Sequence, residues 1–129
     1  MKKKYLIVIA DYYKDITKDL LNNALKILKK PNYINIIRVP GVFEIPVTIS
    51  KNIHKYDGFL ALGCVIKGET PHFDFISQAS TNAIMNLSIN NKKPIGNGII
   101  TCLNMRQAKA RKKKGAEAAK AVISVLSQK

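Results

Sequence analysis

The sequence predicts an α/β fold, a three-layer α/β/α sandwich built on a four-stranded parallel sheet. Short apolar runs of strand length alternate with longer segments whose apolar residues recur every three or four positions, as in amphipathic helices. The run at 5–10 is apolar throughout, which is typical of a strand covered on both faces, and we expect all four strands to be buried. Strands that alternate with helices in this way pair in parallel, so we expect helices on both sides of one sheet.

We expect strands at 5–10, 33–39, 59–64 and 94–102, and helices at 15–29, 42–54, 71–91, 104–111 and 116–126. Asp15 is a suitable N-cap for the first helix, which Lys30 and Pro31 should end. Thr70 is a suitable N-cap for the third helix, with Pro71 at its first position. A turn is expected at 112–115. The 129 residues are expected to form one domain, 1–129, of the flavodoxin-like type.

The composition is ordinary for a soluble globular protein. The net charge of +14 comes from 22 Lys and Arg against 8 Asp and Glu, but nearly all the positive charge is lysine spread along the chain. We therefore expect no nucleic-acid partner, although anionic substrates would be attracted. No apolar run is long enough to cross a membrane, and no signal peptide is recognised. Cys64 and Cys102 are expected to be free thiols, which favours the cytoplasm.

Three loops should meet at one edge of the sheet, because each follows the carboxyl end of a strand. They are 11–13, 40–44 and 64–72. Ligands of such folds bind beyond these strand ends. In the third loop, Gly68 and Thr70 precede a helix N-terminus, which suits an anion. His72 lies in the first turn, where the helix end favours a neutral imidazole that can accept a proton. The sequence therefore predicts an anion site with a proton-transfer group beside it.

Each candidate residue also has a structural interpretation. His72 could be a surface or capping histidine, and Glu44 a first-turn glutamate favoured by the helix dipole. Tyr12 could stack on a planar heterocycle or cover the sheet edge. Arg111 and the lysines at 112–114 could bind phosphate or form a solvated turn. The sequence has no metal-ligand spacing, phosphate-binding Walker loop, dinucleotide-binding glycine motif or nucleophile elbow, so we expect no metal.

Two long segments resemble one enzyme family. Residues 40–46, Pro-Gly-Val-Phe-Glu-Ile-Pro, and residues 62–73, Leu-Gly-Cys-Val-Ile-Lys-Gly-Glu-Thr-Pro-His-Phe, are similar to motifs of 6,7-dimethyl-8-ribityllumazine synthases. Weaker matches follow in the same order at 97–101, 107–108 and 114–115. The resemblance extends from about residue 6 to residue 126.

The resemblance implies a reaction without a cofactor. It joins 5-amino-6-(D-ribitylamino)uracil to 3,4-dihydroxy-2-butanone 4-phosphate and releases phosphate and water. By position, His72 would transfer protons and Arg111 would hold phosphate through two hydrogen bonds. Residues expected to contact the ring and ribityl chain are Tyr12, Val42, Phe43, Glu44, Cys64, Val65 and Ile66. Those expected to contact phosphate, or to complete the site, are Gly68, Glu69, Thr70, Asn97 and Lys114.

The resemblance also implies an assembly of five copies with sites between neighbours, and riboflavin synthase as a partner. Asn97 and Arg111 would then come from the adjacent subunit, and the short N-terminus favours a bare pentamer over a larger shell. Asn97 replaces a common phenylalanine, and the turn between Arg111 and Lys114 is shorter than usual. Two other functions stay open on sequence grounds: an archaeal-type riboflavin synthase, and a lumazine- or flavin-binding protein without catalysis.

Overall fold

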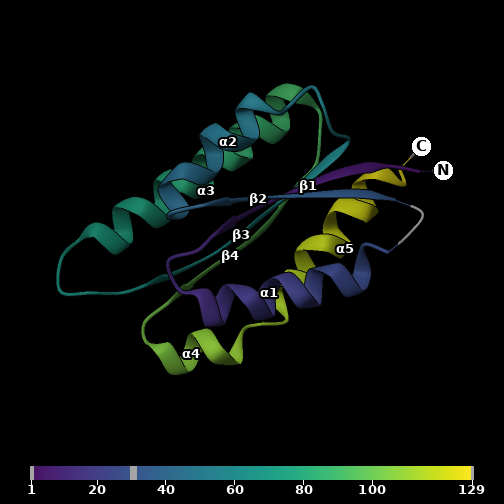
Figure 1. Ribbon diagram of the computed structural model, residues 1–129. Helices are drawn as coiled ribbons and strands as arrows, with labels where there is room; N and C mark the ends of the chain where they lie inside the picture. Colours follow the sequence, from purple (N-terminus) through teal and green to yellow (C-terminus); the bar gives the residue numbers. More distant parts are fainter. Residues whose placement is uncertain (1, 30–31, 129) are drawn as a thin grey trace.

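The computed structural model describes residues 2–29 and 32–128. Its elements in chain order are β1 (Lys4–Ala10), α1 (Lys14–Ile27), β2 (Tyr33–Val39), a 3-10 turn η1 (Val42–Glu44), α2 (Ile45–Lys51), β3 (Gly58–Ile66), α3 (His72–Asn91), β4 (Ile95–Cys102), α4 (Met105–Ala110) and α5 (Lys114–Leu126). Figure 1 shows the sheet between two layers of helices, with α2 and α3 on one side and α1, α4 and α5 on the other. The predicted three-layer α/β/α fold is confirmed.

The sheet has the strand order β2-β1-β3-β4, and every pair is parallel. In the central strand β1, Ile7 lies opposite Ile36 of β2 on one side and Leu60 of β3 on the other. In the outer pair, Leu62 of β3 lies opposite Gly98 of β4. This register brings the carboxyl ends of β1 and β3 together at one edge of the sheet, where the loops of the predicted site begin.

Two apolar cores form because successive side chains of a strand point to opposite faces. Ile7 and Ile9 of β1 join one core with α1, α4 and α5, whereas Leu6 and Val8 join the other with α2 and α3. At residues 6–9 and 59–62 every side chain is completely buried. Burying apolar surface at about 25 cal/mol per Å² is the main force that stabilises such an arrangement.

The expectation of four buried strands was wrong for β2. Only Val39 of this strand is buried, and Tyr33 and Ile36 are exposed. Residues 33–39 include Asn35 and Arg38, which are exposed, and β2 lies at the edge of the sheet, where the flanking helices leave most of it open. Strand order is a tertiary property, but the two polar residues in this run were a local sign of its exposure.

Several predicted helix and strand boundaries also need correction. The cap of α1 is Tyr13, and Asp15 lies inside the first turn without a side-chain capping bond. The cap of α3 is Pro71 and its helix begins at His72, although Thr70 Oγ1 still accepts a hydrogen bond from the His72 N–H at 3.4 Å. The predicted third strand is two residues longer at its carboxyl end and ends at Ile66.

Another correction concerns Gly115, which we expected in a turn and which lies in the first turn of α5. A Cβ atom at this position would lie 2.0 Å from the carbonyl oxygen of Leu20 in α1. The glycine is therefore required by the close approach of two helices.

The helix α1 ends at Ile27, with Leu28 as its C-cap, two residues before the predicted end at 29. Lys30 and Pro31, which we expected to end it, lie outside the described residues. Among the helices that are described, none has the length and apolar character needed to span a bilayer.

Candidate functional site

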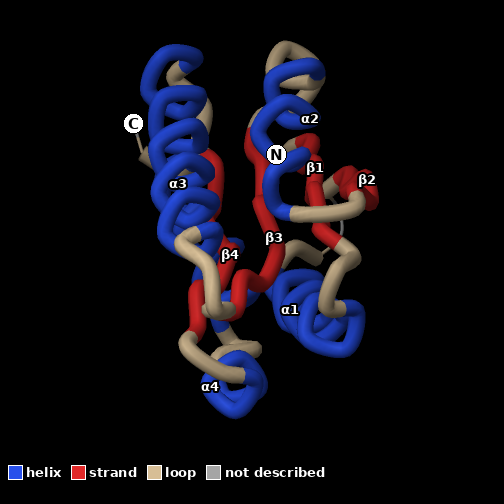
Figure 2. Tube along the Cα trace, turned by 90° about the vertical axis from the view of Figure 1, so that its left-hand side faces the viewer, coloured by secondary structure: helices blue, strands red, loops and turns tan. Residues whose placement is uncertain are grey.

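A crevice of about 370 Å³ opens where the predicted loops meet. Its walls come from the loop after β1, from the turn η1 after β2, and from the end of β3 together with the start of α3. The lining residues are Tyr12, Tyr13, Gly41, Val42, Phe43, Cys64, Val65, Ile66, Gly68, Thr70, His72, Phe73 and Ile76. The predicted convergence of the three loops is thus confirmed. In Figure 2 these loops lie between the α2–α3 layer and the α1 helix.

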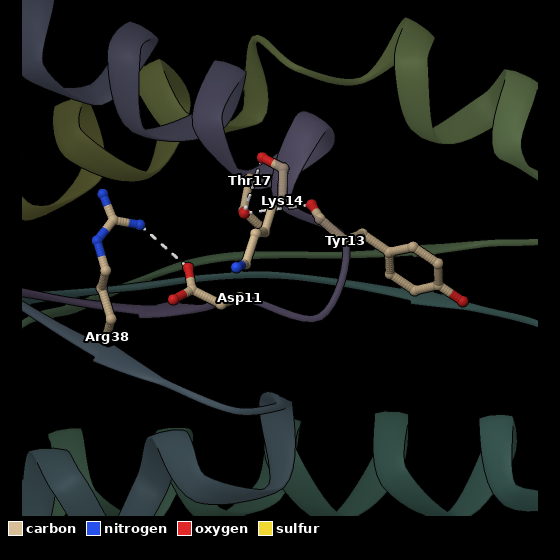
Figure 3. A network of polar contacts seen from close by, with 5 residues as sticks. All are labelled: Asp11, Tyr13, Lys14, Thr17 and Arg38. Carbon is tan, nitrogen blue, oxygen red and sulfur yellow. Dashed lines mark hydrogen bonds and ion pairs between the residues drawn. The ribbon is translucent and has the colours of Figure 1, made fainter.

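The loop after β1 presents two aromatic rings. Tyr12 is 74% exposed, and its ring meets that of Tyr13 edge-on, with centroids 4.9 Å apart and planes at 81°. The base of the loop is tied to β2, because the Asp11 N–H donates to the Val39 carbonyl and Arg38 Nη1 contacts Asp11 Oδ1 at 3.0 Å (Figure 3). The loop thus supplies an accessible aromatic face on a fixed base.

The turn η1 contributes an apolar side chain and a structural carboxylate. Phe43 is 67% exposed at the crevice, whereas Val42 is buried. Glu44 Oε1 accepts a hydrogen bond from the Gly41 N–H at 3.0 Å, which closes the turn. Glu44 does not line the crevice. Its position therefore matches the structural interpretation of this residue, and a ligand contact stays a prediction.

The end of β3 forms the floor of the crevice. Cys64 belongs to the core on the α1 side, and Val65 to the core on the α2–α3 side. Burial, with a smaller contribution from nearby Cys102, raises the pKa of the Cys64 thiol to about 12. Because the thiolate is the reactive form, Cys64 is an apolar wall rather than a nucleophile. Both cysteines are free thiols, as expected.

The start of α3 forms the remaining side. Thr70 and His72 both line the crevice and are exposed, so the imidazole is accessible to a ligand. Gly68 also lines it, and a Cβ atom added there would have no neighbour within 4 Å, so the backbone is open to close approach. Glu69 is exposed and lies outside the lining. The crevice therefore joins an aromatic and apolar wall to a helix N-terminus.

The other three predicted residues lie in a second, larger groove of about 700 Å³, beside the edge strand β4. Asn97, Arg111 and Lys114 line this groove. Asn97 Oδ1 accepts from the Ile99 N–H at 3.0 Å, and Arg111 Nη1 donates to the Thr101 carbonyl at 3.1 Å. Within one chain the predicted site is thus divided between two surfaces, with Asn97 away from its own chain's crevice as expected.

Comparison with known proteins identifies the family. A sequence model described as 6,7-dimethyl-8-ribityllumazine synthase matches residues 2–129. The chain belongs to this family. A lumazine synthase of Agrobacterium fabrum is 40% identical across 100% of the chain and 97% of its own length. One of Bartonella bacilliformis is 45% identical, covering 85% of the chain and 76% of the relative. One of Buchnera aphidicola is 41% identical across 98% and 87%.

The crevice of this lumazine synthase family member contains residues that the sequence did not single out. Tyr13, Gly41, Phe73 and Ile76 line it beside the predicted ones. For Tyr13 a signal existed, because it directly follows Tyr12 in a loop at a strand's carboxyl end. Ile76 carried no such signal: its helical spacing is that of a core residue, and it is buried among core residues as well.

Nothing in the described part of the chain suggests a metal centre in this family member. Over residues 2–29 and 32–128, no three His, Cys, Asp or Glu side chains are grouped closely enough to hold a metal ion.

Proposed function

We propose that the chain condenses 5-amino-6-(D-ribitylamino)uracil with 3,4-dihydroxy-2-butanone 4-phosphate to 6,7-dimethyl-8-ribityllumazine, the reaction of its family. The observation that carries this proposal is the crevice itself. It joins exposed aromatic rings to a helix N-terminus that bears an accessible histidine. A planar heterocycle and a phosphate ester need these two environments side by side.

In this proposal the pyrimidine lies against Tyr12 and Phe43, with the backbone at Cys64, Val65 and Ile66 along its edge. Aromatic rings at an open crevice favour stacking of this kind. Glu44 accepts one hydrogen bond from the Gly41 N–H, but a carboxylate can accept several. The remaining acceptor positions of Glu44 would bind the hydroxyl groups of the ribityl chain.

The phosphate would lie at the start of α3, near Gly68, Glu69 and Thr70. The helix dipole favours an anion at such an end. His72 lies in the same first turn. It would move protons while the amine condenses with the ketone and phosphate departs. Holding two substrates in register supplies much of the rate in such a reaction.

We further propose that the site is completed by a second copy of the chain, in a pentamer. The exposed face of α3 supports self-association, because Phe75, Met85 and Ile89 are 57–68% exposed and lie opposite its buried face of Ile76, Ser80 and Ile84. The groove with Asn97, Arg111 and Lys114 would then face a neighbour's crevice, where Arg111 and Lys114 would add positive charge near the phosphate.

A cytoplasmic location is part of the proposal, supported by two buried free cysteines. The product would pass to riboflavin synthase, the partner that the resemblance implies.

The test is to incubate the purified chain with both substrates and follow lumazine fluorescence against the uncatalysed background. Product formation that saturates with each substrate is expected, and a rate equal to background would refute the proposal. Lumazine supplied alone should not yield riboflavin; if it does, the chain is a riboflavin synthase. A yellow ligand retained on purification, without turnover, would identify a binding protein.

Assembly is tested separately by the mass of the protein in solution. A pentamer is expected, and mixing two inactive variants supplies a second test. His72→Ala subunits mixed with Arg111→Ala subunits should regain activity if each site draws on two chains. No recovery in mixed assemblies would place both residues in one chain's site.

A further inference from the structure

Tyr13 is held more firmly than its neighbour Tyr12. Its ring packs against the core that contains Cys64 and is partly buried, and its edge-on contact with Tyr12 adds a second support. Its carbonyl accepts hydrogen bonds from the N–H groups of Ile16 and Thr17 and from Thr17 Oγ1, because Tyr13 caps α1. The ring therefore points in a direction fixed by both the helix start and the core.

The hydroxyl group of Tyr13 is available to a ligand. The hydrogen bonds that the described residues make at Tyr13 all go to its carbonyl, and none reaches the phenol oxygen. Figure 3 shows the ring pointing away from the Arg38–Asp11 ion pair, and Tyr13 lines the crevice with Cys64 and Ile66. Burial raises the pKa of Tyr13, with Tyr12 and Cys64 adding to the effect, so the phenol stays a neutral donor near pH 7.

We propose that the Tyr13 hydroxyl donates a hydrogen bond to an oxygen of the pyrimidine substrate and helps to select that substrate. This inference rests on the proposed function. Tyr13 lies on the side of the crevice formed by the β1 loop, beside the exposed Tyr12 ring, whereas the helix N-terminus suited to phosphate is formed by α3. A uracil ring with a polyol chain offers several acceptor oxygens on that side. A neutral phenol matches these better than it matches a phosphate dianion, which charged groups and helix N–H groups bind more strongly.

A fixed hydrogen-bond donor of this kind discriminates between ligands, because covering the donor without offering an acceptor is unfavourable. A ring without a suitably placed oxygen would cover the Tyr13 hydroxyl and leave it without a partner, which weakens binding. The selected class is therefore oxygen-bearing heterocycles, and apolar aromatic molecules of similar size are rejected.

The test is Tyr13→Phe, which keeps the packed ring and removes only the hydroxyl group. We expect the KM and the calorimetric Kd for 5-amino-6-(D-ribitylamino)uracil to rise about threefold to tenfold, the range for loss of one neutral hydrogen bond. The KM for the butanone phosphate should stay within about twofold. Tyr33→Phe removes an exposed phenol of β2 far from the crevice and should change neither constant.

Two results for Tyr13→Phe would overturn the inference: an unchanged pyrimidine Kd, or an equal rise in both KM values, which would indicate a disturbed crevice. The calorimetric arm needs no turnover, so it separates the two proposals. Wild-type protein that binds the pyrimidine but makes no lumazine would refute the proposed function and leave Tyr13 testable through Kd. Wild-type protein that fails to bind the pyrimidine would overturn both.

Discussion

Replacing Gly115 by alanine tests how closely α1 and α5 are packed. The added methyl group would lie 2.0 Å from the Leu20 carbonyl oxygen and 2.8 Å from its carbon. An ordinary carbon–oxygen contact is about 3.3 Å, so the helices would have to separate by about 1.3 Å. Both obstructing atoms belong to the backbone, so no side-chain rotation can relieve the contact.

The net effect is a competition between helix propensity and packing. Alanine is favoured over glycine inside a helix by about 1 kcal/mol. Overpacking a core typically costs about 1–3 kcal/mol. The cost of the added methyl group should lie at or above the upper end of this range, because moving α1 away from α5 would also loosen the packing of Leu20 and Ala24 with Ala119 and Val122. We expect a net loss of about 2 kcal/mol in the free energy of unfolding, or a Tm lower by about 5–10 °C.

Urea denaturation at one fixed protein concentration measures this change, because self-association would add to stability. Gly68→Ala is the control, since no atom lies within 4 Å of the added carbon and no glycine in the described residues has a positive φ. It should be neutral or more stable by up to about 1 kcal/mol. A Gly115→Ala protein as stable as wild type would refute the close packing of the two helices.

Three further predictions concern the site and its surroundings. His72→Ala should lower kcat by roughly 10²–10⁴-fold, the contribution of a general acid–base group, and a loss below tenfold in the two-substrate assay would make positioning its main role. The raised pKa of Cys64 means that the folded state keeps the thiol proton at a pH where the unfolded state releases it. The stability that this provides is complete below pH 9 and is lost as pH rises towards 12, by up to about 1.4 kcal/mol per pH unit. Cys64→Ala should therefore lose less stability than wild type between pH 8 and pH 10.5 in urea denaturation, and equal losses would contradict the assignment. Arg38→Met removes the ion pair with Asp11 and should cost under about 1 kcal/mol, because the Arg38 side chain is 56% exposed; a larger loss by the same measurement would mean that the pair anchors the β1 loop.

The fold was predictable because local and tertiary preferences agree along most of the chain. The apolar runs of β1 and β3 can be buried only between two helical layers, and their alternation with amphipathic helices leaves a parallel sheet as the simple solution. The crevice followed for the same reason, since the carboxyl ends of parallel strands meet at one edge. Residues of the β1 loop, of η1 and of α3 could thus be brought together from the order of the elements.

The sequence failed where a residue's role depends on its neighbours in space. We expected β2 to be covered on both faces, yet most of it is exposed, because it lies at the edge of the sheet. Glu44 looks the same in sequence whether it binds a ligand or closes its own turn with the Gly41 N–H.

Residue type and spacing alone determined the elements, the family and the chemistry available at the loop after β3, because these depend on local preferences and on motifs read along the chain. Only the tertiary structure decided that Gly115 serves helix contact and that Tyr13 lines the crevice. It also placed Asn97, Arg111 and Lys114 on a separate groove. Contacts between distant segments depend on how the two helical layers pack on the sheet, and this packing is a property of the whole chain.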